Sequence, residues 1–203
     1  MPSKTERVHP TAVTLLDTVS AMLDTVNPNE IYVDDVLRVS GVSRGSLYHH
    51  FGDYPSLIHA TLIRRFAGNV DRDSAAMRAV AETAASKNDY WIRIRTLSAE
   101  TQIRGRASAR AERARVISLA LTDEKFGRAL AVEQDRLTNT MADAIAVAQD
   151  KGWVTSTLSP RAIAVFLQAY SLGRAVDDVA GAHLPNEEWV SLIETVISAL
   201  EQR

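Results

Sequence analysis

Apolar residues recur at every third or fourth position along most of the chain, and this spacing predicts amphipathic helices. The first such segment is expected to begin at Pro10, because proline suits a first helical turn, and to end at Asn27-Pro28-Asn29. Its apolar stripe consists of Val13, Leu16, Val19, Leu23 and Val26. The chain is therefore expected to open with a helix that buries one face.

Two short helices are expected next, from Val33 to Ser40 and from Arg44 to His50. Gly41 ends the first of them, since glycine readily takes the left-handed conformation that often follows a helix. Ser43 suits the position before the second, where its hydroxyl can accept a bond from a free backbone N–H. The pattern thus predicts two helices joined by a tight turn.

The rest of the chain has the same helical period. Its expected helices run from a cap at Asp53 to about Ala85, from Tyr90 to Gln102, Ala107 to Leu121, Asp123 to Lys151 and Pro160 to Ala180, with a last one capped by Asn186. The clearest stripe lies in this last helix and consists of Trp189, Leu192, Ile193, Val196, Ile197 and Leu200. No strand pattern and no fixed-period repeat is found, so the predicted fold class is all-α.

The composition is typical of a globular protein, with 46% apolar and 24% charged residues. No apolar run is long enough to span a membrane, and residues 1–10 lack the apolar core of a secretory signal. The absence of cysteine excludes disulfides, zinc fingers and thiol catalysis, and it fits a reducing compartment. A cytoplasmic location is therefore expected.

The formal net charge is −2, and residues 1–67 contain six Lys or Arg against seven Asp or Glu. Proteins that bind nucleic acid non-specifically are usually basic, because neutralising phosphates supplies their affinity. Any binding to DNA must therefore depend on positive charge placed locally.

The two short helices and their neighbours form a helix-turn-helix pattern, whose second helix enters the major groove of DNA. That helix must present hydrogen-bonding side chains outward, while Leu47 and Phe51 anchor it from behind. Gly45 is expected to permit a close approach to phosphate, and hydroxyls of the helix can donate to phosphate oxygens. The expected DNA-contacting residues are Ser43, Arg44, Gly45, Ser46, Tyr48 and His49.

Residues 32–51 resemble the DNA-binding signature of TetR-family repressors, in which a Gly-Val-Ser turn precedes a short recognition helix ending in Leu-Tyr-x-x-Phe. Residues 166–174 resemble the penultimate helix of that family. The resemblance implies a homodimer with a helix-turn-helix domain at 1–52 and a larger helical domain for effector binding and dimerisation at 53–203. It also implies a repressor that a small-molecule effector releases from a pseudo-palindromic operator.

One departure from the family concerns a phosphate contact. The family often has lysine where this chain has Tyr54, and it usually has threonine in place of Tyr32. Tyr54 is expected to donate a neutral hydrogen bond to phosphate, which is weaker than the charge-assisted bond of a lysine.

The resemblance also implies a ligand cavity in the larger domain, where large apolar side chains commonly line pockets. The candidates for its wall are Trp91, Met141, Phe166 and Tyr170, although ordinary core packing competes for most of them. The last two helices carry enough apolar surface to pack on a second copy of the chain. The candidates for that dimer interface are Gly173, Trp189, Ile193 and Val196.

Other chemistry is weakly supported. Residues 41–45 match the G-x-S-x-G nucleophile elbow of hydrolases, but that elbow needs a preceding strand. His49 and His50 point about 100° apart on a helix, which disfavours a shared metal ion. The seven arginines between Arg93 and Arg115 are interpreted as a solvated face in preference to a second anionic-ligand surface. No enzyme, metal or cofactor is therefore expected.

The rival hypothesis is a helical ligand-binding or interaction protein whose helix-turn-helix is vestigial. The slightly acidic N-terminal region and Tyr54 favour it. Salt-dependent binding to a palindromic DNA fragment separates the two hypotheses, because a vestigial domain would show none.

Overall fold

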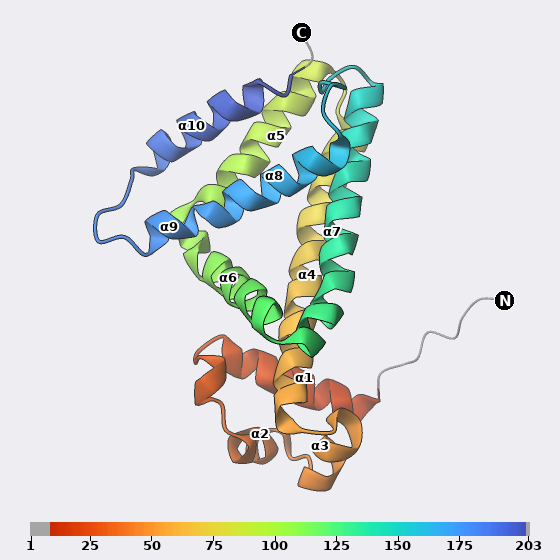
Figure 1. Ribbon diagram of the computed structural model, residues 1–203, viewed down its shortest axis with the longest axis vertical. Coiled ribbons are helices and arrows are strands. Elements are labelled where there is room, and N and C mark those ends of the chain that lie inside the picture. The colour runs from red at the N-terminus through yellow and green to blue at the C-terminus, as the bar shows by residue number, and fades with distance from the viewer. Residues whose placement is uncertain (1–8, 202–203) are drawn as a thin grey trace, which may run out of the picture. The chain divides into compact units, whose positions relative to one another are not determined.

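The computed structural model describes residues 9–201, and within that range the regular structure is helical apart from one isolated β-bridge between Val154 and Glu201. The all-α prediction is confirmed. The elements are α1 (Pro10–Leu23), η1 (Pro28–Glu30), α2 (Val33–Ser40), α3 (Arg44–Phe51), α4 (Tyr54–Thr83), α5 (Lys87–Gln102), η2 (Arg104–Arg106), α6 (Ala107–Thr122), α7 (Glu124–Asp150), α8 (Pro160–Gly173), α9 (Ala175–Asp178) and α10 (Asn186–Ser198) (Figure 1). None of the helices between residues 9 and 201 has the length and apolar character needed to cross a membrane.

The chain divides into two compact units that meet between Ala67 and Gly68, inside α4. The predicted domain boundary between residues 52 and 53 lies at the start of that helix instead. The first turns of α4 are bonded to α1, since Arg64 pairs with Asp17 at 2.6 Å and Arg65 donates to the Ser20 carbonyl at 2.9 Å. These contacts explain why the beginning of α4 belongs to the N-terminal unit.

Local signals in the N-terminal unit act as the sequence predicts. Gly41 has a φ of +67°, the left-handed conformation that ends α2. Ser43 Oγ accepts from Ser46 N at 3.2 Å and caps α3, and Asp53 accepts from Ser56 N at 2.7 Å at the start of α4. These bonds satisfy N–H groups that have no partner within the helix, so they define where both helices begin.

Some predicted helix ends are wrong. The predicted helix from Pro160 to Ala180 is divided, because α8 ends at Gly173 and the short α9 follows. Asn186 is the first residue of α10 rather than its cap, and its side-chain oxygen accepts from Arg174 at 2.8 Å. A long-range bond has therefore replaced the local one that the sequence suggested.

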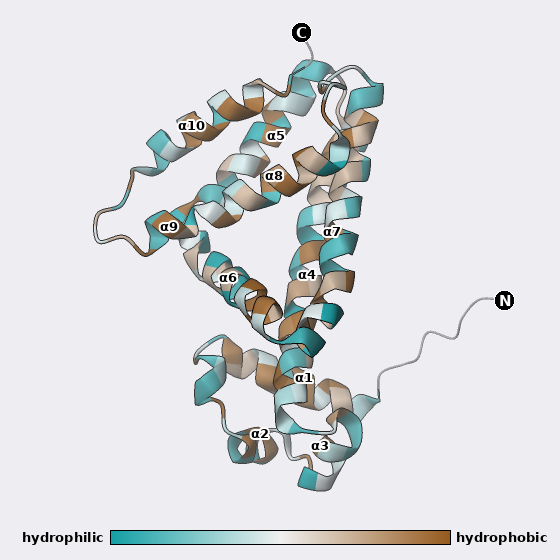
Figure 2. Ribbon diagram, viewed as in Figure 1, coloured by the Kyte–Doolittle hydropathy of each residue, from teal (hydrophilic) through white to brown (hydrophobic). Residues whose placement is uncertain are grey.

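Two long helices frame the larger unit. Figure 1 shows α4 and α7 running in the same direction, and ion pairing between Arg136 and Asp71 joins them. Lys151 also donates to the Ala81 carbonyl at 2.8 Å. Figure 2 shows hydrophobic residues recurring at intervals along α8 and α10, as expected for helices with one buried face.

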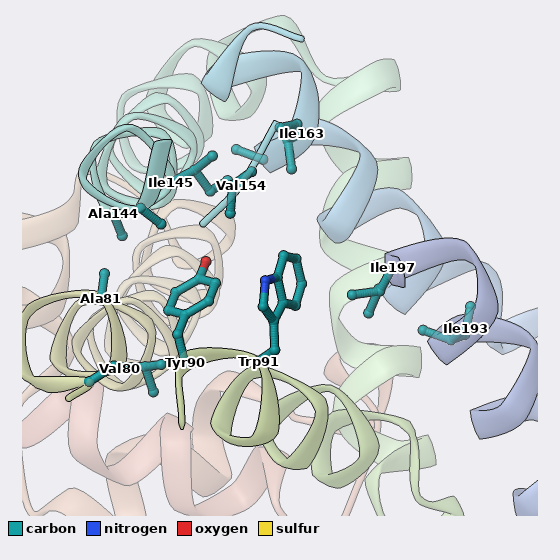
Figure 3. Packing of buried hydrophobic residues seen from close by; sticks show 13 residues of the cluster. Val80, Ala81, Tyr90, Trp91, Ala144, Ile145, Val154, Ile163, Ile193 and Ile197 are labelled. Atoms are coloured by element: carbon teal, nitrogen blue, oxygen red, sulfur yellow. The ribbon is translucent and has the colours of Figure 1, made fainter. Parts of the chain in front are cut away.

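The core of the larger unit gathers buried side chains from α4, α5, α7, α8 and α10 (Figure 3). The rings of Tyr90 and Trp91 meet edge to face at 5.2 Å within it, a favoured geometry for aromatic pairs. Trp91 also donates its indole N–H to the Trp153 carbonyl at 3.0 Å. The polar atom of this large side chain is thus satisfied inside the core.

Candidate nucleic-acid interface and effector cavity

The recognition-helix candidate, α3, is attached to its unit by one fully buried residue. Leu47 has no exposed surface, and neither does Val36 of the preceding helix α2. The cap from Ser43 sets the first turn of α3, so the direction of the following side chains is determined locally. The predicted short helix is confirmed, and it extends through Phe51.

The opposite face of α3 is open within the N-terminal unit. Tyr48 is 42% exposed, while Ser46 is half-buried. Apart from its chain neighbours and the backbone of α3 itself, no atom lies within 4 Å of the position that a Cβ on Gly45 would take. The exposed members of the predicted DNA-contacting set are Ser43, Arg44, Gly45, Tyr48 and His49. Four of these polar or small residues thus lie on α3 and Ser43 caps it, as a groove-binding helix requires.

Carboxylates of α2 lie beside this face. Arg44 forms an ion pair with Asp34, and Arg38 pairs with Asp35 at 2.8 Å. Both pairs are largely exposed, so each is expected to contribute little to stability. Asp34 accepts from one nitrogen of the Arg44 guanidinium, which carries five N–H donors in all, so a nucleic acid would compete with Asp34 for part of this group.

Tyr54 does not present a free donor. Its hydroxyl donates to the Ile31 carbonyl at 2.6 Å, and burial raises the pKa of Tyr54 to about 12. A phenol has a single hydrogen to donate. The expected phosphate contact therefore needs correction, because the hydrogen is already engaged in joining the start of α4 to the segment before α2.

Three histidine rings meet beside α3. His50 stacks on His9 at 4.8 Å between ring centroids and contacts His49 edge to face at 5.1 Å. Burial lowers the pKa of His50, and the charges of His9 and His49 lower it further. Within residues 9–201 no group of three His, Asp or Glu side chains is arranged to hold a metal ion.

The larger unit contains a cavity of about 140 Å³. Met141 and Tyr170, two of the four residues predicted to line it, do so. Trp91 lies in the core beside a smaller cavity of about 20 Å³, and Phe166 is 41% exposed and lines neither of these two cavities. The wall is formed by Asp73, Ala76, Met77, Ile94, Leu97, Ser98, Thr101, Arg113, Leu137, Met141, Leu167, Gln168, Tyr170, Ser171 and Ile197.

The polar side of this cavity is held by hydrogen bonds. Tyr170 Oη lies 2.8 Å from Ser98 Oγ, and Arg113 donates to the side-chain oxygen of Gln168 at 3.0 Å. Burial lowers the pKa of Arg113, and the charge of Asp73 partly offsets that effect. The cavity therefore combines an apolar lining with a positively charged guanidinium.

Periodicity did not identify Arg113, Gln168 or Asp73 as cavity residues. Arg113 lies in the arginine-rich stretch that was interpreted as a solvated face. That interpretation is wrong for part of the stretch, because Arg110 is 5% exposed and binds both oxygens of Asp178 at 2.6 and 2.7 Å. The partner lies far away in the sequence, so the sequence contained no local signal for its burial.

The predicted dimer residues divide into two groups. Gly173 and Val196 are exposed, whereas Ile193 is buried in the core of its own subunit. Trp189 is partly buried and donates its indole N–H to Gln102 at 2.9 Å. Ile193 cannot therefore contact a second copy, because it already fills the face of α10 that packs inward.

No protein-family model and no curated protein sequence matches this chain. Its fold, however, matches many solved structures. GusR of Salmonella enterica has a TM-score of 0.68 and 17% identity, covering 99% of this chain and 100% of its own. A TetR-family transcriptional regulator from Pectobacterium atrosepticum has a TM-score of 0.67 and 19% identity, covering 95% of each chain.

A third structure, a regulator from the Thermobifida fusca strain YX-ER1 that is assigned to the TetR/AcrR family, has a TM-score of 0.65 and 15% identity. It covers 93% of this chain and 97% of its own. These identities are low, whereas the coverage includes nearly the whole of each chain. The protein therefore has the fold of the TetR-family transcriptional regulators.

Proposed function

We propose that this protein is a homodimeric transcriptional regulator that binds a pseudo-palindromic operator and is released from it by a small-molecule effector. The observation that carries the proposal is the exposed polar face of α3, whose inner side is locked by the fully buried Leu47. The fold shared with TetR-family regulators supports it. In this proposal the protein acts as a cytoplasmic repressor without enzymatic activity.

Arg44 is the proposed base-reading residue, because it is the one arginine in α3 and a guanidinium can bind guanine through two hydrogen bonds. Ser43, Tyr48 and the backbone at Gly45 are the proposed phosphate contacts, with Ser46 and His49 beside them. Replacing Arg44 with alanine is expected to weaken operator binding by about 1–3 kcal/mol. Arg38→Ala is the matched control, since Arg38 is an exposed arginine on the neighbouring helix α2.

The experiment begins with selection of bound sites from random DNA by the purified full chain, followed by titration of the selected fragment in a gel shift. A regulator of this class selects two half-sites about one helical turn apart or a multiple of it. The absence of salt-dependent binding to any fragment would instead favour the vestigial helix-turn-helix hypothesis.

The proposed dimer interface combines an exposed stripe of α8 with exposed residues of α10. These positions are apolar and recur at helical spacing: Ala162, Val165, Phe166, Ala169 and Gly173 on α8, and Leu192 and Val196 on α10. An exposed apolar surface of this kind suits an isologous contact, in which the same patch of two copies meets across a two-fold axis. Two subunits would supply the two recognition helices that a palindrome needs.

The proposed effector site is the cavity of the larger unit, where Met141 and Tyr170 contribute to the wall. An effector releases DNA only to the extent that it binds the non-DNA-binding conformation more tightly than the other. Titrating a candidate effector into the protein–operator complex measures that difference directly.

A further inference from the structure

The cavity of the larger unit is small. Its volume of about 140 Å³ is close to that of an apolar protein cavity of about 150 Å³ that holds one benzene molecule. A multi-ring ligand would extend beyond this volume. The size therefore favours a ligand with a single ring or an equally short hydrocarbon chain.

The apolar part of the wall can accept such a ring. Leu97, Leu137, Met141 and Leu167 come from three different helices, α5, α7 and α8. Methionine adapts its shape to aromatic ligands and makes favourable sulfur–ring contacts. A hydrocarbon that packs against this side of the cavity would have its apolar surface removed from water.

The polar part of the wall centres on Gln168, whose side-chain amide has partners on both sides. Its oxygen accepts from Arg113 at 3.0 Å and from Gln134 at 2.8 Å. Its nitrogen donates to Thr138 Oγ1 and to the Ala164 carbonyl, each at 3.2 Å. A neutral and fully bonded amide therefore holds the Arg113 guanidinium in place without neutralising its charge.

One carboxylate, Asp73, also lines the cavity. Its side chain is 45% exposed and lies 3.7 Å from Arg106, which comes from η2. Asp73 thus also interacts with a cation outside the wall, and Arg113 is the cationic side chain among the residues that line the cavity. The hydroxyls of Ser98, Thr101, Tyr170 and Ser171 add neutral polar groups to the same wall.

We propose that the ligand of this cavity is a compact organic anion: a carboxylate attached to one aromatic ring or to a hydrocarbon chain of similar size. The carboxylate pairs with Arg113, whose planar guanidinium matches its geometry, and the hydrocarbon packs against the leucines and Met141. This inference deepens the proposed function, because it names the chemical class of the effector.

The test measures binding to the full-length protein by calorimetry with three ring compounds of similar size: benzoate, benzamide and benzylammonium. Benzoate is expected to bind at least about tenfold more tightly than benzamide, since charged hydrogen bonds are the stronger ones. Benzylammonium is expected to bind least. The inference is overturned if benzamide or benzylammonium binds as tightly as benzoate, or if benzoate does not bind at about 10 mM, where a site with a Kd of about 1 mM would be mostly filled.

Two variants locate the site. Arg113→Met is expected to reduce benzoate affinity at least about tenfold while changing benzamide affinity less than about threefold. Arg128→Gln, at an exposed arginine of α7, should change neither. Ala76→Phe places a ring into the cavity from α4 and should abolish binding of both compounds, with the helix content checked by circular dichroism. Unchanged benzoate binding in either cavity variant overturns the assignment.

The calorimetry contains no DNA, so its result is independent of the regulator hypothesis. If benzoate binds as expected but leaves the operator complex intact, the ligand class stands and the proposed release by this ligand fails. If operator binding is observed but benzoate binding is absent, the regulator hypothesis stands and the ligand class fails.

Discussion

At the scale of single residues, the proposed DNA-reading arginine is held by a carboxylate of its own unit. Arg44 pairs with Asp34, whose side chain is 81% exposed. An exposed pair of this kind is usually worth about 0.2–1 kcal/mol. DNA must compete with Asp34 for the guanidinium, and the carboxylate also repels phosphates.

We therefore expect Asp34→Asn to tighten operator binding about two- to fivefold, because it removes that competition. Fluorescence anisotropy with a labelled operator at constant salt measures the change. Asp35→Asn is the matched control, since it removes the same charge from α2 but frees Arg38 instead. An equal gain in both variants would show that only the general charge matters.

Tyr54 is expected to stabilise the fold rather than bind phosphate. Tyr54→Phe removes the hydrogen bond to the Ile31 carbonyl, and it should lower the free energy of unfolding by about 0.5–1.5 kcal/mol. Operator affinity should stay within about twofold, because the hydroxyl hydrogen is not available to phosphate. Urea unfolding and anisotropy measure the two effects separately. A stable variant with much weaker DNA binding would restore the phosphate role.

His50 gives the N-terminal unit a predictable response to pH. Its pKa in the folded protein is lowered, chiefly by burial, so the unfolded chain, with a pKa of about 6.5, binds the proton more readily. This contribution to stability is present above the unfolded pKa and is lost as the pH falls below it. Unfolding at pH 7.5 and 5.5 should show the loss, and His50→Gln should reduce it. An identical pH response in that variant would exclude His50 as the cause.

At the scale of elements, the first turn of α3 contains Gly45, although the helix could form with another residue at that position. Gly45 has an ordinary helical conformation, and a Cβ there would contact nothing within 4 Å. Gly41 differs, because its φ of +67° suits glycine. We therefore expect Gly45 to serve DNA binding and Gly41 to serve the fold.

Gly45→Ala should raise the free energy of unfolding by about 0.5–1 kcal/mol, since alanine favours helix, yet weaken operator binding by keeping α3 further from phosphate. Gly41→Ala should instead lower the free energy of unfolding by about 1–2 kcal/mol, because the left-handed conformation is unfavourable for alanine. Thermal unfolding and gel shifts check both. Undiminished operator binding by Gly45→Ala would remove the close-approach role.

At the scale of the whole molecule, the exposed apolar stripe of α8 is expected to hold two subunits together. Phe166→Glu places a charge in that stripe and should yield a monomer in sedimentation experiments, because burying an unpaired charge is costly. Its operator affinity should fall with the loss of the second half-site. Thr195→Glu, at an exposed polar position of α10, is the control. A dimeric Phe166→Glu protein would place the interface elsewhere.

The predictions that succeeded rest on signals contained within a few residues. Gly41, Ser43 and Asp53 each define a helix end through a bond or a conformation that spans at most three positions. Asn186 failed as a cap, because its side chain is bonded to Arg174 instead. Long-range partners of that kind have no signature in a local pattern.

The sequence by itself determined which segments are helical and which side chains lie on the outer face of α3, because helical period and capping are local properties. It did not determine which side of a helix with a broad apolar surface packs into the core. Ile193 and Val196 lie on one continuous stripe, yet packing against α5 buried the first and left the second exposed. The burial of Arg113 beside Gln168 was likewise decided only when distant helices came together, since the cost of burying a charge depends on partners that folding supplies.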